Sequence, residues 1–347
     1  MLRTLAERPS LHPIPEGLDP RLIKSDFLNQ RLNKELEMPA VPSCTFVTLA
    51  GTADSPFLEI VLKHLLNMCS FPFHDVLLVV DDLPKDGGNA EEQARQVANL
   101  LIIAGRLQEG GSVSRLIKLS SADREHLSAK YFGNRRIKAA RDLRGVPLFG
   151  WVVGLDAAET DFVMHFDSDI LLHQDPQFDW IKVGMKLIED DPSAMFVSPR
   201  PGPPTADGRL GGQAVDPTLD SQGNFRFKTF SSRRFLVKKR RFESFLPTPA
   251  VYEPSKYSAL TRLGFHGRIL PWEEFVNRSL SASSFYRVHL SSREAWSIHS
   301  PAHTAEWLQA LPHIIKCVEQ GQYPPEQAGY YDLVLPPWLS HVPDGRA

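Results

Sequence analysis

Short apolar runs alternate along the first half of the chain with longer segments in which apolar residues recur every three to four positions. The uninterrupted runs are typical of buried strands, and the periodic segments are typical of amphipathic helices. Strands are therefore predicted at 44–50, 74–82, 112–120 and 161–166, and helices at 55–69, 89–107 and 147–160. Ser55 is the expected N-cap of the first helix, with Pro56 at its first position.

This alternation predicts the fold class. Strands that are separated by helices of such length are joined by right-handed crossovers, which give a mostly parallel central sheet with helices on both faces. We therefore expect an α/β protein with a Rossmann-like sheet and a smaller C-terminal subdomain. The apolar pattern predicts further strands near 225–238, short helices between 239 and 281, and a helix near 304–320.

Four regions are expected from these patterns. Residues 1–41 form a helix-bearing N-terminal extension, and residues 42–198 form the α/β half, an architecture typical of nucleotide binding. Residues 199–224 are rich in Pro, Gly and Asp without any period, which indicates a flexible loop. Residues 225–347 form the substrate-specific half and a proline-rich tail.

Composition excludes several classes of partner. The 347 residues carry a net charge of -2, so no global positive field points to nucleic acid. The first twenty residues contain charges and prolines where a secretory signal needs an apolar segment, and no apolar run reaches membrane-spanning length. We expect a cytoplasmic protein, with peripheral membrane contact left open. The three cysteines lack metal-ligand spacing and are assigned no chemistry.

Two carboxylates follow the predicted strand at 161–166. In parallel α/β sheets, ligands bind beyond the carboxyl ends of the strands, where Asp167 and Asp169 are expected, as are Asp81 and Asp82 after an earlier strand. Two carboxylates in one buried place repel each other unless a cation lies between them. Mg²⁺ and Mn²⁺ favour such oxygens together with phosphate. The pair therefore predicts a divalent metal that holds a diphosphate.

The competing α/β signatures are missing from the sequence. It has neither the GxxxxGK[ST] of a P-loop nor a GxGxxG after a strand, and it has no GxSxG or HExxH motif.

The segments "VTLAGTADSPFLEIVLKHLL" and "HDVLLVVDD", followed by "DFVMHFDSDILL", resemble the nucleotide-sugar half of a GT-A glycosyltransferase, similar to the large family 2 group of the nucleotide-diphospho-sugar transferases. The resemblance covers about 44–198. It implies that Thr48 and either Asp81 or Asp82 contact the nucleoside. It further implies that Asp167 contacts the ribose and the metal, and that Asp169 contacts the metal.

Two downstream landmarks fit the same resemblance. In "PWEEFVNRSL", Glu273 and Glu274 stand where the family has an acidic motif that supplies a catalytic base, although acidic residues are also favoured in any first helical turn. In "AWSIHSPAH", His299 is the expected late histidine that returns to the metal, with His303 as the second candidate. The sequence does not separate Glu273 from Glu274.

Two segments of the sequence are rich in Lys and Arg. Six Lys or Arg residues lie in the segment from Arg233 to Arg241. One interpretation is that this segment meets an anionic acceptor, the diphosphate or a membrane surface. The other is that it is a solvated helix face. The resemblance places "TFSSRRF" at the floor of the acceptor site. In "NRRIKAARDLRG", Arg144 is the residue that we expect near the nucleotide.

The expected function is transfer of a hexosyl or related glycosyl group from a nucleotide-diphosphate sugar to an acceptor hydroxyl, with Mn²⁺ or Mg²⁺ and with inversion. The acceptor, whether saccharide, lipid-linked or small molecule, is left open. Three alternatives remain: a retaining GT-A enzyme, a sugar nucleotidyltransferase, and a non-catalytic binding protein on the same fold.

Overall fold

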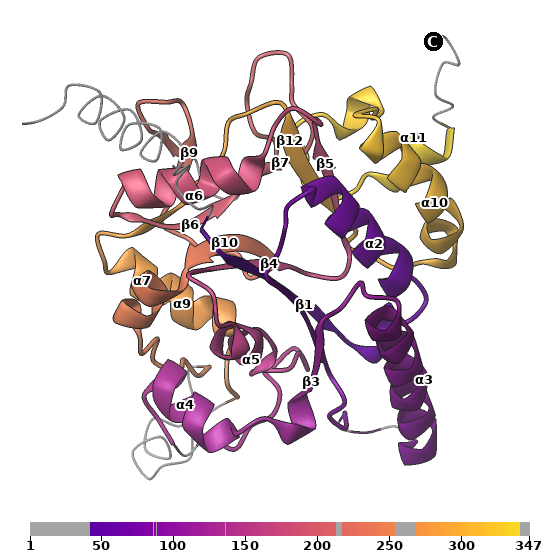
Figure 1. Cartoon of the computed structure of the whole chain (residues 1–347), viewed down its shortest axis with the longest axis vertical. Coiled ribbons are helices and arrows are strands. Elements are labelled where there is room, and N and C mark those ends of the chain that lie inside the picture. The colour runs from indigo at the N-terminus through magenta and orange to yellow at the C-terminus, as the bar shows by residue number, and fades with distance from the viewer. Residues whose placement is uncertain are drawn as a thin grey trace, which may run out of the picture. The chain divides into compact units, whose positions relative to one another are not determined.

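A nine-stranded sheet has the strand order β3-β2-β1-β4-β10-β6-β11-β9-β8 (Figure 1). The computed structural model describes residues 42–85, 87, 89–135, 137–212, 217–253 and 268–340. The predicted extension at 1–41 lies outside them. The strands of this sheet are β1 (Cys44–Ala50), β2 (Asp75–Val80), β3 (Arg115–Lys118), β4 (Phe162–Phe166), β6 (Ala194–Ser198), β8 (Thr218–Leu219), β9 (Phe225–Phe227), β10 (Arg234–Lys238) and β11 (Tyr286–His289).

The predicted strands of the first half are all present, and they lie side by side. Strand β1 pairs in parallel with β2 and β4, and β2 pairs in parallel with β3. The fold class is therefore confirmed as α/β with a parallel core. Strand β10 then enters antiparallel between β4 and β6. Its first residues consequently lie at the edge of the sheet where β4 ends.

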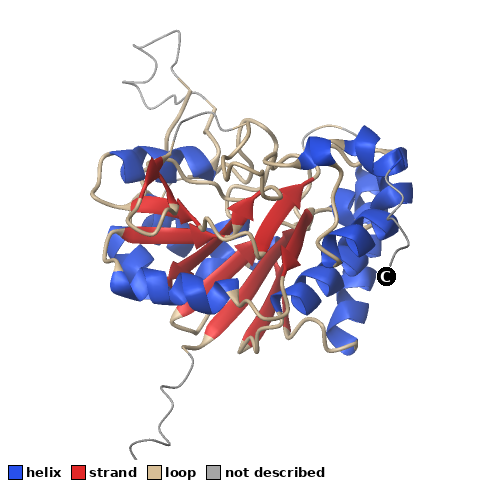
Figure 2. Ribbon diagram, turned by 90° about the horizontal axis from the view of Figure 1, so that it is seen from above, coloured by secondary structure: helices blue, strands red, loops and turns tan. Residues whose placement is uncertain are grey.

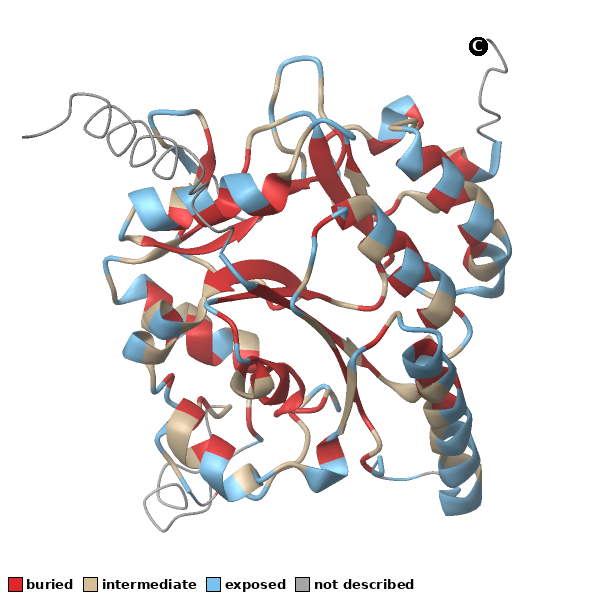
Figure 3. Ribbon diagram, viewed as in Figure 1, coloured by how far each residue is buried: buried red, intermediate tan, exposed pale blue. Residues whose placement is uncertain are grey.

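Helices cover both faces of the sheet (Figure 2). They are α2 (Leu58–Cys69), α3 (Ala90–Glu109), α4 (Arg124–Phe132), α5 (Gly150–Ala157), α6 (Trp180–Asp190), α7 (Lys239–Phe245), α9 (Trp272–Ser281), α10 (Ala305–Glu319) and α11 (Leu335–Ser340). Side chains of α2, α3, α6 and α10 belong to one buried cluster, and those of α4, α5, α7 and α9 belong to the other. Burial is concentrated in the strands and on the helix sides that face them (Figure 3).

A second, three-stranded sheet carries the region around the predicted late histidine. Its strand order is β5-β12-β7. The three strands are β5 (Ile170–Gln174), β12 (Ala295–His299) and β7 (Arg200–Pro201). The antiparallel register of β12 and β5 places His299 opposite Ile170, directly after Asp169. The region 199–224, predicted as a loop, contributes the short strands β7 and β8, and its residues 213–216 are outside the described ones.

Some local predictions were wrong. Ser55 does not cap the first helix, because α2 begins at Leu58 with Phe57 at the N-cap, after a 3-10 turn at Thr52–Asp54. Helix α4 was missed because it is short and only weakly amphipathic. Helix α3 begins as expected, since the Asn89 side chain accepts hydrogen bonds from the first backbone N–H groups.

The chain divides into two units, Met1–Val41 and Pro42–Ala347, and the predicted halves 42–198 and 225–347 both contribute strands to the sheet of the second unit. Within the described ranges, none of the helices combines the length and the apolar character needed to cross a membrane.

Candidate active site

Asp167 lies directly after β4, at the carboxyl edge of the sheet. Its Oδ1 accepts a hydrogen bond from Trp151 Nε1 of α5 at 3.3 Å. The same oxygen lies 2.9 Å from His165 Nε2. Its backbone N–H donates to the carbonyl oxygen of Arg233 at 2.8 Å. About a quarter of the side chain is exposed, 24%. Asp167 is therefore held in place while part of its carboxylate faces a cavity.

Asp169 lies between two histidines. Its Oδ2 is 3.4 Å from His299 Nε2 and 3.2 Å from His303 Nε2. Burial acts to raise the pKa of Asp169, but the hydrogen bonds and positive charge of the two histidines outweigh it and hold the pKa well below its usual range. The structure thus brings both histidine candidates to the same carboxylate.

These carboxylates line a cavity of about 320 Å³, which we call the acidic cavity. Asp54, which the sequence reading missed, also lines it. Burial raises the pKa of Asp54 to about 6; hydrogen bonds from Gly51 N and from Ser168 oppose the shift, and the charge of Asp169 adds to it. The signal for Asp54 was the turn "GTAD" after the first strand, at the edge where ligands bind.

Asp81 lines the acidic cavity as part of an ion pair. Arg141 holds it with both ends of its guanidinium, Nη1 to Oδ2 at 2.9 Å and Nη2 to Oδ1 at 3.0 Å. Arg141 also donates to the carbonyl oxygens of Leu83, Pro84 and Gly145. Both side chains are almost fully buried, at 9% and 5% exposed. Arg144, the predicted residue, is exposed three positions further on.

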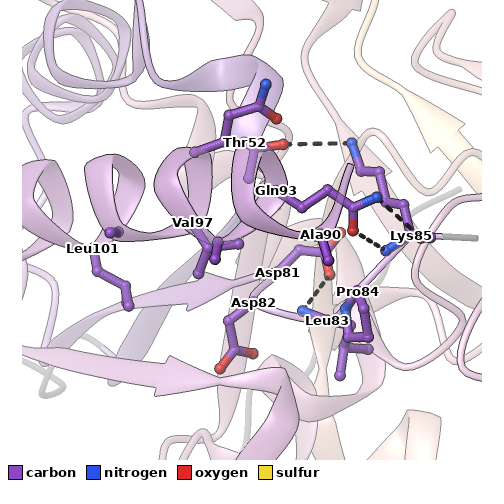
Figure 4. Close-up of a pocket in the computed structure, with 13 residues that line it drawn as sticks. Thr52, Asp81, Asp82, Leu83, Pro84, Lys85, Ala90, Gln93, Val97 and Leu101 are labelled. Atoms are coloured by element: carbon purple, nitrogen blue, oxygen red, sulfur yellow. Dashed lines mark hydrogen bonds between the residues drawn. The ribbon is translucent and has the colours of Figure 1, made fainter. Parts of the chain in front are cut away.

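A larger cavity of about 420 Å³ lies between the end of β2 and α3, and we call it the α3 cavity (Figure 4). It shares Asp81 and Lys85 with the acidic cavity and is otherwise lined by residues such as Val97 and Leu101 of α3. Asp82 also lines it and accepts a hydrogen bond from Ser120 N at 2.8 Å. The two cavities therefore meet at Asp81.

Thr48 is not brought to either cavity. Successive residues of a strand point to opposite faces, and Leu49 is the residue of this pair that lines the acidic cavity. Thr48 is 1% exposed and lies on the other face with Phe46 and Ala50, where its Oγ1 has no hydrogen-bond partner among the described residues.

The two glutamates at the start of α9 differ in their surroundings. Glu273 turns inward, and its Oε2 accepts a hydrogen bond from Ser232 Oγ at 3.2 Å, whereas Glu274 is exposed. Burial raises the pKa of Glu273 above its ordinary value, against the hydrogen bonds from Ser232. Trp272 stacks on Trp151, the residue that bonds Asp167, with ring centroids 5.9 Å apart. The structure thereby separates two glutamates that the sequence left equivalent.

His299 links this site to the C-terminal segment. Its Nδ1 is 2.9 Å from Asp332 Oδ1, its ring stacks on Tyr331, and Arg233 Nη1 contacts both ring nitrogens. The two ring nitrogens of His299 therefore face different carboxylates, Nδ1 that of Asp332 and Nε2 that of Asp169.

The family resemblance implies a divalent metal, and the candidate ligands for it are the side chains of Asp167, Asp169, His299 and His303. Within the ranges that the structure describes, no group of three or more His, Cys, Asp or Glu side chains is arranged so that it could hold a metal ion. The chemistry of the individual donors nevertheless fits, because Asp169 Oδ1 is buried without a hydrogen-bond partner and two imidazoles accompany the carboxylate.

No protein-family model matches the chain, and no curated protein matches it. Among solved structures, it is similar to galactosyltransferase LgtC in complex with donor and acceptor sugar analogs, at 15% identity over 68% of this chain and 70% of that chain, with a TM-score of 0.29. It is similar to the mannosyltransferase PcManGT from Pyrobaculum calidifontis in complex with GDP-Man and Mn²⁺, at 16% identity over 65% and 56%, with a TM-score of 0.32. It is also similar to S. aureus TarS, at 13% identity over 79% and 40%, with a TM-score of 0.38. Two of these three are named as sugar transferases.

Proposed function

We propose that this protein is an inverting glycosyltransferase that takes a nucleotide-diphosphate sugar as donor. The observation that carries the proposal is the acidic cavity at the carboxyl edge of the sheet. There Asp54, Asp167 and Asp169 gather beside the Asp81–Arg141 pair, and this is the edge where parallel α/β sheets bind their ligands.

The two adjoining cavities suit the two ends of the donor. The α3 cavity has apolar walls and the Asp82 carboxylate, which fit a base and a ribose. The acidic cavity then takes the diphosphate and the sugar. Asp169 and one of the two histidines beside it, His299 or His303, would hold Mn²⁺ or Mg²⁺ there. That ion, when bound, would neutralise the charge of the departing diphosphate.

Glu273 is assigned as the general base. In the transfer, the acceptor oxygen forms a bond to the anomeric carbon as the bond to the diphosphate oxygen breaks, and the hydroxyl proton moves to the Glu273 carboxylate. Ser232 Oγ orients that carboxylate, and its raised pKa makes it a stronger base than an exposed glutamate. Glu274 is exposed and has no such role.

Calorimetry with UDP and GDP in the presence of Mn²⁺ tests the donor site. Asp169→Asn should weaken nucleotide binding about a hundredfold, since it removes the carboxylate that would hold the ion to which the diphosphate binds. Asp190→Asn is the matched control, because Asp190 is 60% exposed and pairs only with Lys186 at the surface. Equal binding by the parent and Asp169→Asn would remove Asp169 from the donor site.

The α3 cavity is tested in the same experiment. Val97→Trp places a large ring in the cavity and should weaken binding of the same nucleotide about tenfold. Ile102→Trp is its control on the same helix, since Ile102 is 63% exposed and does not line the cavity. Unchanged binding by Val97→Trp would place the nucleoside elsewhere.

A further inference from the structure

A third cavity, of about 290 Å³, lies next to His299, and we call it the basic cavity. Its lining includes Arg233, Arg234, Arg287, His289, Tyr331 and Asp332. Arg234 begins β10 and pairs with Phe166 at the end of β4, while Arg287 and His289 belong to β11. The antiparallel entry of β10 thus brings arginines to the sheet edge that carries Asp167.

The three arginines lack the carboxylate partners that buried cations usually have. Arg234 is 3% exposed and Arg287 is 7% exposed. Within the described part of the chain, no Asp or Glu oxygen lies within ion-pair distance of Arg233, Arg234 or Arg287. The acidic groups whose charge reaches them are Glu273, bonded to Ser232, and Asp332, bonded to His299.

Several polar atoms around this cavity are also unsatisfied. The Nε atoms of Arg234 and Arg287 and the Nδ1 atom of His289 are buried without a hydrogen-bond partner among the described residues. Aromatic rings compensate in part, because the Arg234 guanidinium lies 3.7 Å from the centroid of Tyr331 and that of Arg287 lies 4.8 Å from Phe227. Burial and the neighbouring Arg234 lower the pKa of Arg287 to about 9. The fold tolerates this charge, but it does not neutralise it.

The basic cavity shares a wall with the proposed reaction site. Arg233 and Asp332 line it and also contact His299, which faces Asp169. Ser231 lines it as well, and the next residue, Ser232, holds Glu273. A molecule in the basic cavity would therefore lie beside the general base and on the far side of His299 from Asp169.

We propose that the basic cavity binds an oxyanion group of the acceptor, a phosphate or a carboxylate, so that the acceptor is an anionic molecule. The assignment to the acceptor rests on the proposed function. Guanidinium forks recognise both oxyanions through paired charge-assisted hydrogen bonds, and three arginines line this cavity. The diphosphate of the donor is the other source of the same chemistry, and the test distinguishes the two.

The test is calorimetric titration of the full chain with inorganic phosphate, without metal and at constant ionic strength. The parent should bind phosphate saturably, and Arg287→Met should bind it at least about tenfold more weakly. Arg226→Met is the matched control, because Arg226 on β9 also stacks on an aromatic ring, at 4.5 Å from the centroid of Tyr286, but pairs with Asp191 outside the cavity. Thermal melts verify that each variant is folded, and Arg233→Met, at a less buried position, replaces Arg287→Met if that variant does not fold.

A second titration, with UDP or GDP and Mn²⁺, identifies the source of the oxyanion. Equal nucleotide binding by the parent and Arg287→Met supports an acceptor site, whereas a parallel loss assigns the cavity to the donor diphosphate and overturns the proposal. Phosphate binding that is absent, or unaffected by both arginine variants, also overturns it. If neither nucleotide binds the parent, the proposed function fails and the acceptor assignment falls with it, while the phosphate titration still reports independently on the anion site.

Discussion

The acidic and basic cavities lie on either side of His299, and they differ in how their charges are balanced. In the acidic cavity, Asp81 is paired with Arg141 and Asp169 with two histidines. In the basic cavity, Arg234 and Arg287 have aromatic rings beside them and no carboxylate in ion-pair contact among the described residues. The buried Asp81 of the first cavity thus has its counter-ion in the protein, whereas the buried arginines of the second are the ones that an anion from outside would neutralise.

Glu273, which is bonded to Ser232 next to Ser231 of the basic cavity, gives the largest expected effect. Glu273→Gln should lower kcat about a thousandfold without changing nucleotide binding, because the amide cannot take the acceptor proton. Glu274→Gln, its exposed neighbour, should leave kcat unchanged. Equal effects of the two variants, measured as turnover of the identified donor, would exclude the assignment.

The same residue predicts a pH dependence. A carboxyl whose pKa is raised works as a base only above that pKa, so kcat/KM should fall as the pH is lowered through a value above the ordinary 4.5 of glutamate. This acid limb should be missing from the residual activity of Glu273→Gln. If the parent and Glu273→Gln both show this acid limb in kcat/KM, the limb belongs to a titrating group other than Glu273.

Breaking the balanced pair should destabilise the fold. Arg141→Met leaves Asp81 buried without its partner, which should lower the free energy of unfolding by about 3 kcal/mol in urea denaturation. Arg144→Met, three residues away and exposed, should change it by less than about 0.5 kcal/mol. Similar stabilities for the two variants would show that the Asp81–Arg141 pair does not stabilise the fold.

Removing an unbalanced cation should have the smallest effect on stability. Arg287→Met keeps an apolar contact with Phe227 and removes a buried charge that has no carboxylate partner, so unfolding should change by less than about 1 kcal/mol, in either direction. A loss as large as that of Arg141→Met would show that the protein already neutralises Arg287. The contrast between the cavities would then be wrong.

The sequence predicted the parallel half of the sheet because each strand there is one uninterrupted apolar run, and it predicted the Asp167 and Asp169 positions because they follow such a run. It could not tell which of Arg141 and Arg144, or which of Glu273 and Glu274, turns inward. The nucleoside contact of Thr48 was expected from the resemblance alone. The pleat of β1 instead determines on which face of the sheet the Thr48 side chain lies. The basic segment that starts at Arg233 was singled out for an anionic partner. The other walls of the basic cavity were not predicted, since β11 and the residues near 331 are far from that segment in sequence.

The hydrogen bond from Asp167 N–H to the Arg233 carbonyl, and the pairing of Phe166 with Arg234, join the two cavities through one backbone ladder. A ladder can shift only in steps of whole residues, and a one-residue slip turns every side chain to the opposite face. The distance between the acidic and the basic cavity is consequently fixed when the sheet forms. Insertions between β9 and β10 should be tolerated only if they leave the start of β10 in its present register.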